Sequence, residues 1–444
     1  MADPSTQQDR QARIKTSLGE DVLVLERFDT IERLSDPFLF TADVRSERGE
    51  MDLREELGTA VSVGIYDGDD VVRWFHGVFY EAELIGYDLR AARYRITLRP
   101  WFALLDLNRD SRIYQAKSVK DIIQDVFDRA GFSDYDLSKL TKTYPQREYC
   151  VQFRESDFAF VSRLMEEEGI YYFFDHQEDK HIFHACEGMV SHDRVAGLEA
   201  IKYVAGGHEQ GGRFGQIWSW AAKLNFAPGK VTLRDYNFKT PQAPVTGEAT
   251  RENRHPHDSA ELYDYPANAM TNGDAARYAD QRLKAASTDR FTFAGEGDCV
   301  ALTCGARFDL TDHPDRAFDK EYLVVETQHR FLTEAFLSRA IEELSEAYGA
   351  DTSPMIVSIR AVQGDLYWRP ERLTPWPRPA GPQTAVVVGP AGETIYVDEF
   401  SRVKVQFPWD RQGKNDDQSS CWMRVSQGWA DGGYGIIFIP RIGQ

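Results

Sequence analysis

The chain has 444 residues, 42% of them hydrophobic and 28% charged, and its formal net charge at pH 7 is −19. This length is too great for a single hydrophobic core, so we expect about two to four domains. The negative charge would repel a phosphate backbone, which argues against nucleic acid as a partner.

Residues 1–12 are polar and are predicted to be disordered. They lack the apolar core of a secretory signal peptide, so a protein of this kind would leave the cell by a route that does not read one. No apolar run approaches the roughly 20 residues that span a bilayer, so we expect no stable membrane insertion. The five cysteines are odd in number and scattered, which favours reduced thiols and folding in a reducing cytoplasm.

Residues 13–101 form a strand-rich stretch. The runs Val61–Tyr66 and Tyr94–Leu98 have the composition of strands, and Tyr66–Asp69 has the residues of a hairpin turn. We therefore predict a first tube-like β-barrel over this range.

Residues 102–205 mix helices with strands. A helix is expected to begin after Ser118, which can cap its free N–H groups together with Asp121. The apolar residues of this helix follow one face, namely Val119, Ile122, Ile123, Val126 and Phe127. A second helix is predicted over Ser156–Glu168, so this range reads as an α+β domain.

Residues 206–367 are again strand-rich and are predicted to form a second tube-like β-barrel with helices. Helices are expected over about Asp274–Ala286 and over Phe336–Tyr348, where apolar residues follow one stripe. Residues 368–381 are rich in proline, which removes backbone donors and stiffens the chain, so they read as a linker.

Residues 382–444 consist of short strand-like runs between turn residues, and Arg402–Phe407 alternates strictly between polar and apolar side chains. Five short strands around one apolar core favour a barrel of the oligonucleotide/oligosaccharide-binding (OB) type. The expected strands are Thr384–Gly389, Thr394–Asp398, Arg402–Phe407, Cys421–Ser426 and Gly435–Pro440. Because no terminal turn or polar tail follows, we expect the natural chain to continue past Gln444. The predicted fold class is thus β-rich and multidomain (α+β): two tube-like barrels with an α+β insert, then an OB barrel.

Several rare strings in this chain occur in an order and at a spacing that can be compared with a known family. They are GPQTA at 381–385, RVKVQF at 402–407, CWMRVSQ at 421–427 and PRIGQ at 440–444, with EEGIYYFF at 167–174 and YDYP at 263–266 upstream. With these strings the chain resembles VgrG, the spike protein of bacterial type VI secretion, which is itself similar to the phage tail hub. The resemblance covers most of the chain. The Phe336–Tyr348 helix is not expected at that place in the family.

The resemblance implies a mechanical role. A homotrimer would present two comparable barrels per chain as a nearly six-fold ring, which can cap a hexameric tube of Hcp-like protein. Further partners would be baseplate components, a PAAR-like tip protein and effectors. Such a spike is assembled in the bacterial cytoplasm and exported by the apparatus, and it carries no catalytic, cofactor-binding or metal-binding residues in this part.

Two histidine groups suggest metal ligands at first sight. In His181–Cys186, strand alternation places His184 and Cys186 on one face and His181 on the other, so the three cannot converge. His255, His257 and Asp258 lie in a stretch rich in turn residues, with His313 further along, which suits a surface turn. Cys299 and Cys304 lack the spacing of a zinc knuckle. We therefore expect structural roles for all of them.

The other candidates for chemistry are also weak. Ser426 lacks the glycine two residues earlier that a nucleophile elbow needs, because Arg424 stands there. Gly428–Gly435 has no lysine or following helix to cradle phosphate and is expected to be a hairpin loop. Glu166, Glu167 and Glu168 fan out around a helix by about 100° each, so they are expected to form a solvated helix end.

Trp409, Trp422 and Trp429 leave two alternatives to the spike open. Aromatic side chains on an OB surface can stack sugars or bases, although barrel core or a subunit contact is the favoured reading. A phage-like spike with a cell-wall glycan hydrolase activity is the other alternative, but the many carboxylates do not single out a catalytic pair.

Overall fold

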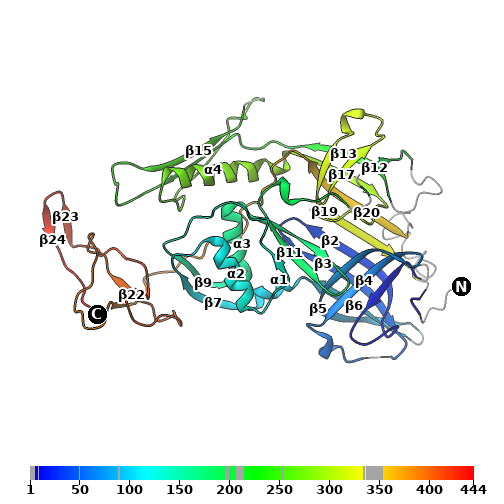
Figure 1. Ribbon diagram of the computed structural model, residues 1–444, viewed down its shortest axis with the longest axis horizontal. Coiled ribbons are helices and arrows are strands. Elements are labelled where there is room, and N and C mark those ends of the chain that lie inside the picture. Colours follow the sequence, from blue (N-terminus) through cyan, green and yellow to red (C-terminus); the bar gives the residue numbers. More distant parts are fainter. Residues whose placement is uncertain are drawn as a thin grey trace. The chain divides into compact units, whose positions relative to one another are not determined.

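The computed structural model of the chain describes residues 6–8, 10–49, 51–88, 91–195, 198, 200–206, 215–252, 255–333, 336 and 354–444 (Figure 1). The chain divides into two compact units. The first consists of Met1–Ala103, Asp134–Thr141 and Glu166–Arg372, and the second of Leu104–Ser133, Lys142–Met165 and Leu373–Gln444. These units do not follow the linear order of the predicted domains, because both draw on the range 102–205.

The first unit begins with six antiparallel strands whose inner face is aromatic. In spatial order they are β1 (Ala12–Lys15), β4 (Ala60–Asp67), β5 (Asp70–Asp88), β6 (Ala91–Arg99), β3 (Asp36–Ser46) and β2 (Val24–Arg33). Phe28, Phe40 and Phe75 are fully buried and meet edge to face at centroid distances of 5.3–5.8 Å. The predicted strands Val61–Tyr66 and Tyr94–Leu98 and the turn between β4 and β5 are confirmed.

The seam between β1 and β2 is bridged by a side chain. The Gln7 carboxamide accepts hydrogen bonds from the backbone N–H groups of Ile14 (2.9 Å) and Leu25 (3.2 Å) and donates one to the Ile14 carbonyl (3.1 Å). Gln7 is buried, and its own N–H is held by Asp21. The expectation of a disordered stretch over 1–12 therefore fails at Gln7, because this polar side chain replaces missing ladder bonds.

A second set of six strands closes on itself. In spatial order it contains β19 (Glu321–Leu332), β18 (Arg307–Thr311), β12 (Ala200–Tyr203), β13 (Gln216–Leu224), β17 (Phe291–Gly297) and β20 (Met355–Gln363), and β20 pairs back onto β19. β2 pairs with β19 from Arg27↔Leu332 to Arg33↔Glu326, so both sets form one continuous sheet (Figure 1). Val300–Thr303, which has the composition of a strand, instead turns between Asp298 and Ala306.

An α/β module is inserted in the second barrel, between β13 and β17. Its strands are β14 (Lys230–Asp235), β15 (Val245–Thr250) and β16 (Glu261–Asp264), and they are covered by α4 (Asn272–Ser287). The buried core joins Val231, Leu233 and Val245 to Ala275 and Ala279 of the helix. The helix predicted over Asp274–Ala286 is therefore confirmed.

A small sheet completes the first unit, with β11 (His181–Cys186) between β10 (Tyr171–His176) and β8 (Tyr135–Asp136). Among the described residues, the other short helices are α1 (Trp101–Leu104), η1 (Arg54–Glu56), η2 (Leu105–Leu107), η3 (Met189–Ser191), η4 (Thr288–Arg290) and η5 (Arg316–Phe318). Of the helix expected over Phe336–Tyr348, only Phe336 belongs to the described residues, so that prediction lies outside them.

The second unit is built around a two-stranded sheet and two helices. β7 (Arg109–Tyr114) pairs with β9 (Cys150–Ser156), and the helices are α2 (Val119–Arg129) and α3 (Asp157–Glu168). The last three residues of α3, from Glu166 on, belong to the first unit. Ser118 and Asp121 form the predicted capping box, and the five apolar residues of the α2 stripe are buried. Both helix predictions are thus confirmed.

The terminal segment of the second unit contains two separate strand pairs. β21 (Val386–Val388) pairs with β22 (Lys404–Gln406), and β23 (Trp429–Asp431) pairs with β24 (Tyr434–Ile436). Two of the five expected strands, Thr394–Asp398 and Cys421–Ser426, are not strands in the structure. Ile442 donates to Thr394, and Val403 and Met423 exchange two backbone hydrogen bonds in an isolated bridge. The strand pairs of residues 382–444 do not by themselves close a barrel. The OB fold therefore stays a prediction.

In the described part of the chain, no helix is both long and apolar enough to traverse a lipid bilayer.

Candidate functional site

The β23–β24 hairpin presents a run of apolar side chains to solvent. The exposed fractions are 62% for Trp429, 58% for Ile436, 77% for Ile437 and 63% for Phe438. Gln427 holds the segment after the hairpin, because its side chain accepts from the Phe438 N–H (2.7 Å) and donates to the Phe438 carbonyl (3.2 Å). A contiguous exposed apolar patch of this kind is typical of a protein contact surface. We call residues 429–438 the apolar hairpin.

Aromatic and ionic contacts hold the terminal segment on the body of the second unit. Trp409 packs edge to face on Phe153 of β9 (5.4 Å between centroids), and its indole N–H donates to Gln383 (2.8 Å). Arg411 donates to the buried carboxylate of Asp110 (2.9 Å). Trp409 and Arg411 therefore attach the segment to β9 and β7.

The proline-rich stretch is fastened as well. The Arg163 guanidinium lies 4.9 Å from the ring centroids of both Phe160 and Trp376 and pairs with the Glu155 carboxylate through two bonds of 2.7 and 2.8 Å. Arg163 is almost fully buried, so the loss of its hydration is compensated by this bidentate pair and by the Val151 carbonyl. At Trp376, the predicted linker is thus part of the packed unit.

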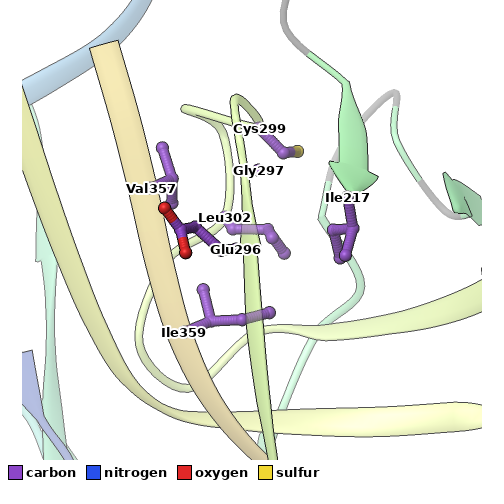
Figure 2. Close-up of a pocket in the computed structure, with 7 residues that line it drawn as sticks. All are labelled: Ile217, Glu296, Gly297, Cys299, Leu302, Val357 and Ile359. Atoms are coloured by element: carbon purple, nitrogen blue, oxygen red, sulfur yellow. The ribbon is translucent and has the colours of Figure 1, made fainter. Parts of the chain in front are cut away.

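The second barrel contains a small recess that is lined mostly by apolar groups. Figure 2 shows Ile217, Leu302, Val357 and Ile359 around it, with Cys299 and Gly297 at one side and one carboxylate, Glu296. The empty space is about 140 Å³, smaller than the roughly 300 Å³ of an ordinary ligand site. Burial raises the pKa of Cys299 to about 12, so this thiol is not a ready nucleophile.

The structure places the three residues of the first histidine group in separate environments. The His181 ring is buried between His76 and the Trp101 N–H, whereas His184 stacks on Phe173 and lies 3.3 Å from a carboxylate oxygen of Asp136. Cys186 is buried, and burial raises its pKa to about 12. Alternation along β11 keeps His184 and Cys186 on one face and His181 on the other.

The second histidine group forms a turn. His255 and His257 are exposed, whereas the buried carboxylate of Asp258 accepts from Arg251 (3.3 Å) and from the His255 N–H (3.2 Å). Elsewhere, His313 packs on Tyr203 and Phe318 and accepts from the Asp315 N–H. Cys299 and Cys304 lie in different core clusters. Within the described ranges, no group of three or more His, Cys, Asp or Glu residues has the arrangement of a metal site.

The prediction for the glutamates was wrong. Glu167 and Glu168 are buried, and Glu168 accepts hydrogen bonds from Arg277 and from the Tyr278 hydroxyl of α4. The helix end is covered by α4, which a sequence pattern local to 166–168 cannot reveal. Ser426 is exposed and belongs to no strand, and Gly428–Gly435 contains the expected hairpin turn.

The three tryptophans differ in their surroundings. Trp409 is half-buried against Phe153 and Phe407, Trp422 packs on Tyr396 (4.9 Å), and Trp429 lies in the apolar hairpin. The first two serve packing within the unit. Trp429 has the exposure that a contact with another molecule requires.

Sequence inspection missed a buried polar network in the first unit. Glu32 and Arg73 form an ion pair of 2.5 Å inside the barrel, with His176 and His329 beside them. The available signal was a charged residue at an inward-facing strand position. By strand alternation, Glu32 is on the same face as Phe28, and Arg73 is on the same face as Phe75. No spacing rule joins these residues, because they come from strands far apart in the sequence.

Comparisons with known proteins agree on one family. Residues 31–334 match the phage tail baseplate hub (GPD) family. The type VI secretion system spike protein VgrG1b of Pseudomonas aeruginosa is 36% identical over 99% of this chain, and the actin cross-linking toxin VgrG1 of Vibrio cholerae is 31% identical over 96% of it. The chain spans 58% of the first relative and 39% of the second.

A solved structure supports the fold. The Escherichia coli c3393 protein, described as a component of the type VI secretion system with structural similarity to the T4 bacteriophage tail proteins gp27 and gp5, has a TM-score of 0.64 to this chain. The match is 18% identical and covers 93% of this chain and 92% of that one.

Proposed function

Because the chain belongs to the phage tail baseplate hub family, with type VI secretion spike proteins of the VgrG type as relatives, we propose that it works as a homotrimeric spike that caps a hexameric tube and helps to deliver effectors. It is assembled in the bacterial cytoplasm and exported by the apparatus. Its partners are an Hcp-like tube protein, baseplate components, a PAAR-like tip protein and effectors.

The observation that carries this proposal is the joined pair of six-stranded sets. The closed barrel of β12, β13 and β17–β20 continues through the β2–β19 pairing into the six strands β1–β6. Three copies of the chain would present six such sets, a number that fits a six-membered tube ring. The apolar hairpin supplies a surface that self-association would cover.

The proposed role is mechanical rather than enzymatic. In the described residues, no group of three or more His, Cys, Asp or Glu has the arrangement of a metal site, and the recess of Figure 2 is too small for an ordinary substrate. The alternative of a glycan hydrolase or of a carbohydrate-binding OB module has no specific observation in its favour.

The test combines mass and secretion in the full-length protein. We expect the full-length protein to have the solution mass of a trimer. This chain, at 50.7 kDa, would be present in three copies. Ile437→Asp places a charge in the apolar hairpin without touching a buried core, so it should weaken self-association while the chain stays folded. Val405→Asp, in the buried cluster of the terminal segment, should abolish secretion.

His257→Ala and Ser426→Ala are the matched controls, because both residues are exposed and should leave tube firing intact. A full-length protein that stays monomeric at high concentration would contradict the proposal. So would normal secretion by the Val405→Asp variant, or hydrolysis of cell-wall glycan by the purified chain.

A further inference from the structure

A buried polar network lies where three parts of the first unit meet. Glu32 comes from β2, Arg73 and His76 from β5, His176 and His181 from the β10–β11 hairpin, and His329 from β19 of the second barrel. Figure 1 places β2, β5, β11 and β19 in this part of the unit. The network thus links both barrels and the small sheet through side chains.

The ion pair at its centre makes several further hydrogen bonds. Arg73 donates to Glu32 through its terminal nitrogen Nη2. Its other terminal nitrogen, Nη1, donates to the carbonyls of Val300 (3.2 Å) and Leu302 (2.6 Å) on the second barrel. Glu32 also accepts from the Thr327 hydroxyl (3.2 Å). Burial opposes ionisation of Glu32, but Arg73 and the hydrogen bond from His176 outweigh it, so the pKa of Glu32 lies below its ordinary value.

The contacts of His329 favour its neutral form. Its Nε2 atom lies 2.9 Å from Nη1 of Arg73, which also donates to the Val300 and Leu302 carbonyls. Because a guanidinium group only donates, the neutral ring presents the Nε2 lone pair to it. Nδ1 therefore carries the proton and lies 3.1 Å from the Thr30 hydroxyl. A proton on Nε2 would remove this acceptor and place a second cation against Arg73.

The same reasoning applies to His181 and His76. The backbone N–H of Trp101 donates to Nε2 of His181 (3.0 Å), so the proton of the neutral His181 ring is on Nδ1. From there it points at Nδ1 of His76 (2.9 Å), which must accept and therefore lacks a proton. Protonation of either ring would replace one of these hydrogen bonds with two opposed donors.

His176 differs from the other three histidines. Its Nε2 lies 3.1 Å from a Glu32 oxygen, and its Nδ1 faces both the N–H (3.2 Å) and the carbonyl (3.1 Å) of His76. A charge on His176 disfavours a proton on His76 and on His181.

From this geometry we propose that the neutral rings of His76, His181 and His329 form an acid-sensitive lock that holds both barrels and the β10–β11 hairpin together at neutral pH and releases them on acidification. The groups that face these rings are Glu32, Thr30 and Thr327, Arg73 with the Val300 carbonyl, His176, Asp179 and the Trp101 N–H. Asp179 is the carboxylate that favours a charge on His76, and Glu32 is the one that favours a charge on His329.

The direction of the pH effect follows from burial. Burial, followed by the neighbouring cations, lowers the pKa of His76 to about 4 and lowers the pKa of His181 and His329 below the ordinary value. A histidine whose pKa is depressed in the folded state stabilises that state at neutral pH. This stability is lost as the pH falls below about 6.5, the pKa of the unfolded side chain. Glu32 stays ionised in the folded state throughout this window, so the response comes from histidines. His184 and His192, whose pKa burial also lowers, contribute to it beside the three rings of the lock.

The lock is tested by hydrogen exchange of the full chain between pH 7 and pH 4, corrected for the intrinsic pH dependence of exchange. We expect protection to fall first in β10, β11 and β19. In the double variant His181→Gln/His329→Gln, an amide supplies one acceptor and one donor at each site without titrating, so the midpoint of opening should move to lower pH by about 0.5 unit or more. His257→Gln, on an exposed turn, should behave like the wild type.

An unchanged midpoint in the double variant would overturn the proposal, as would opening that starts elsewhere in the first unit. If the variant does not fold, the wild type itself gives the answer through NMR of ¹⁵N-labelled histidine rings. The lock requires all three rings to be neutral at pH 7. The proton must be on Nδ1 in His181 and His329 and on Nε2 in His76. Charged rings or the opposite tautomers at that pH would refute it.

Discussion

Gly247 lies on β15 directly beneath helix α4. A Cβ atom at this position would be 2.0 Å from the carbonyl carbon of Ala275 and 2.3 Å from its oxygen. These contacts are with backbone atoms, which cannot move aside as the end of a flexible side chain can. The close approach of helix and strand in the inserted module therefore requires glycine here.

We predict that Gly247→Ala destabilises the inserted module by about 1–3 kcal/mol, the ordinary cost of overpacking. Urea unfolding followed by circular dichroism measures this change in the free energy of unfolding. Gly188→Ala is the matched control, because Gly188 has an extended backbone (φ −176°) and open space around its Cα. Equal effects of both substitutions would show that the close approach does not matter.

At the same scale, burial of individual polar residues was the least predictable feature. Glu168 has the sequence context of an exposed helix end, yet Arg277 from more than one hundred positions along the chain covers it. Gln7 stands in a polar stretch, yet it bridges two strands. Local composition describes the segment, whereas burial depends on what another segment places on top of it.

Helix α2 illustrates an element whose ends and buried face follow from its sequence. Its N-terminus is set by Ser118, whose side chain accepts from the Asp121 N–H (3.2 Å), while Asp121 accepts from the Ser118 N–H (3.0 Å). The hydrogen bonds from the Ser118 hydroxyl and backbone lower the pKa of Asp121. The cap and the apolar periodicity involve only residues of the helix and its N-terminus. The folded protein therefore has both of them as predicted.

We predict that Ser118→Ala destabilises the second unit by about 1 kcal/mol, because an N–H of the first turn loses its acceptor. The pKa of Asp121 should rise toward its ordinary value in the same variant. Because a depressed carboxyl pKa stabilises the folded state above the unfolded pKa, the wild type should lose this advantage as the pH falls through the acid range. Urea titrations at neutral and acid pH, with NMR titration of Asp121, measure both effects.

Ser118→Thr is the control for the cap, since threonine also accepts from the first turn and should restore most of the stability. If Ser118→Ala and Ser118→Thr were equally stable, the hydroxyl would have no capping role.

Strands of the terminal segment show where element prediction fails. Val386–Val388 and Lys404–Gln406 lie within two of the expected strands and pair with each other, and alternation and β-propensity are strong there. Cys421–Ser426 has a similar composition, but only Met423 bridges to another strand. A strand needs a partner with a matching register, and propensity does not state whether the fold provides one.

In the first unit as a whole, the sequence correctly indicates two strand-rich regions. It does not indicate that β2 and β19, almost 300 positions apart, join them in one sheet. The core of the second barrel contains Phe293, which is fully buried and packs on Tyr322 (4.7 Å) and Trp220 (5.7 Å). Tyr322 is part of β19, the strand that continues the sheet into the six strands β1–β6.

This connectivity predicts that the two barrels unfold together. Phe293→Ala should cost about 3–5 kcal/mol, because it removes an aromatic side chain from a packed core. If β2 and β19 couple the barrels, hydrogen-exchange protection should fall in β3, β5 and β6 as well as in β17–β20. Phe226→Ala is the control, since Phe226 is 78% exposed and should leave both barrels unchanged. Loss of protection confined to the second barrel would mean that the shared strand pair does not transmit stability, and the unit would then consist of two independent folding domains.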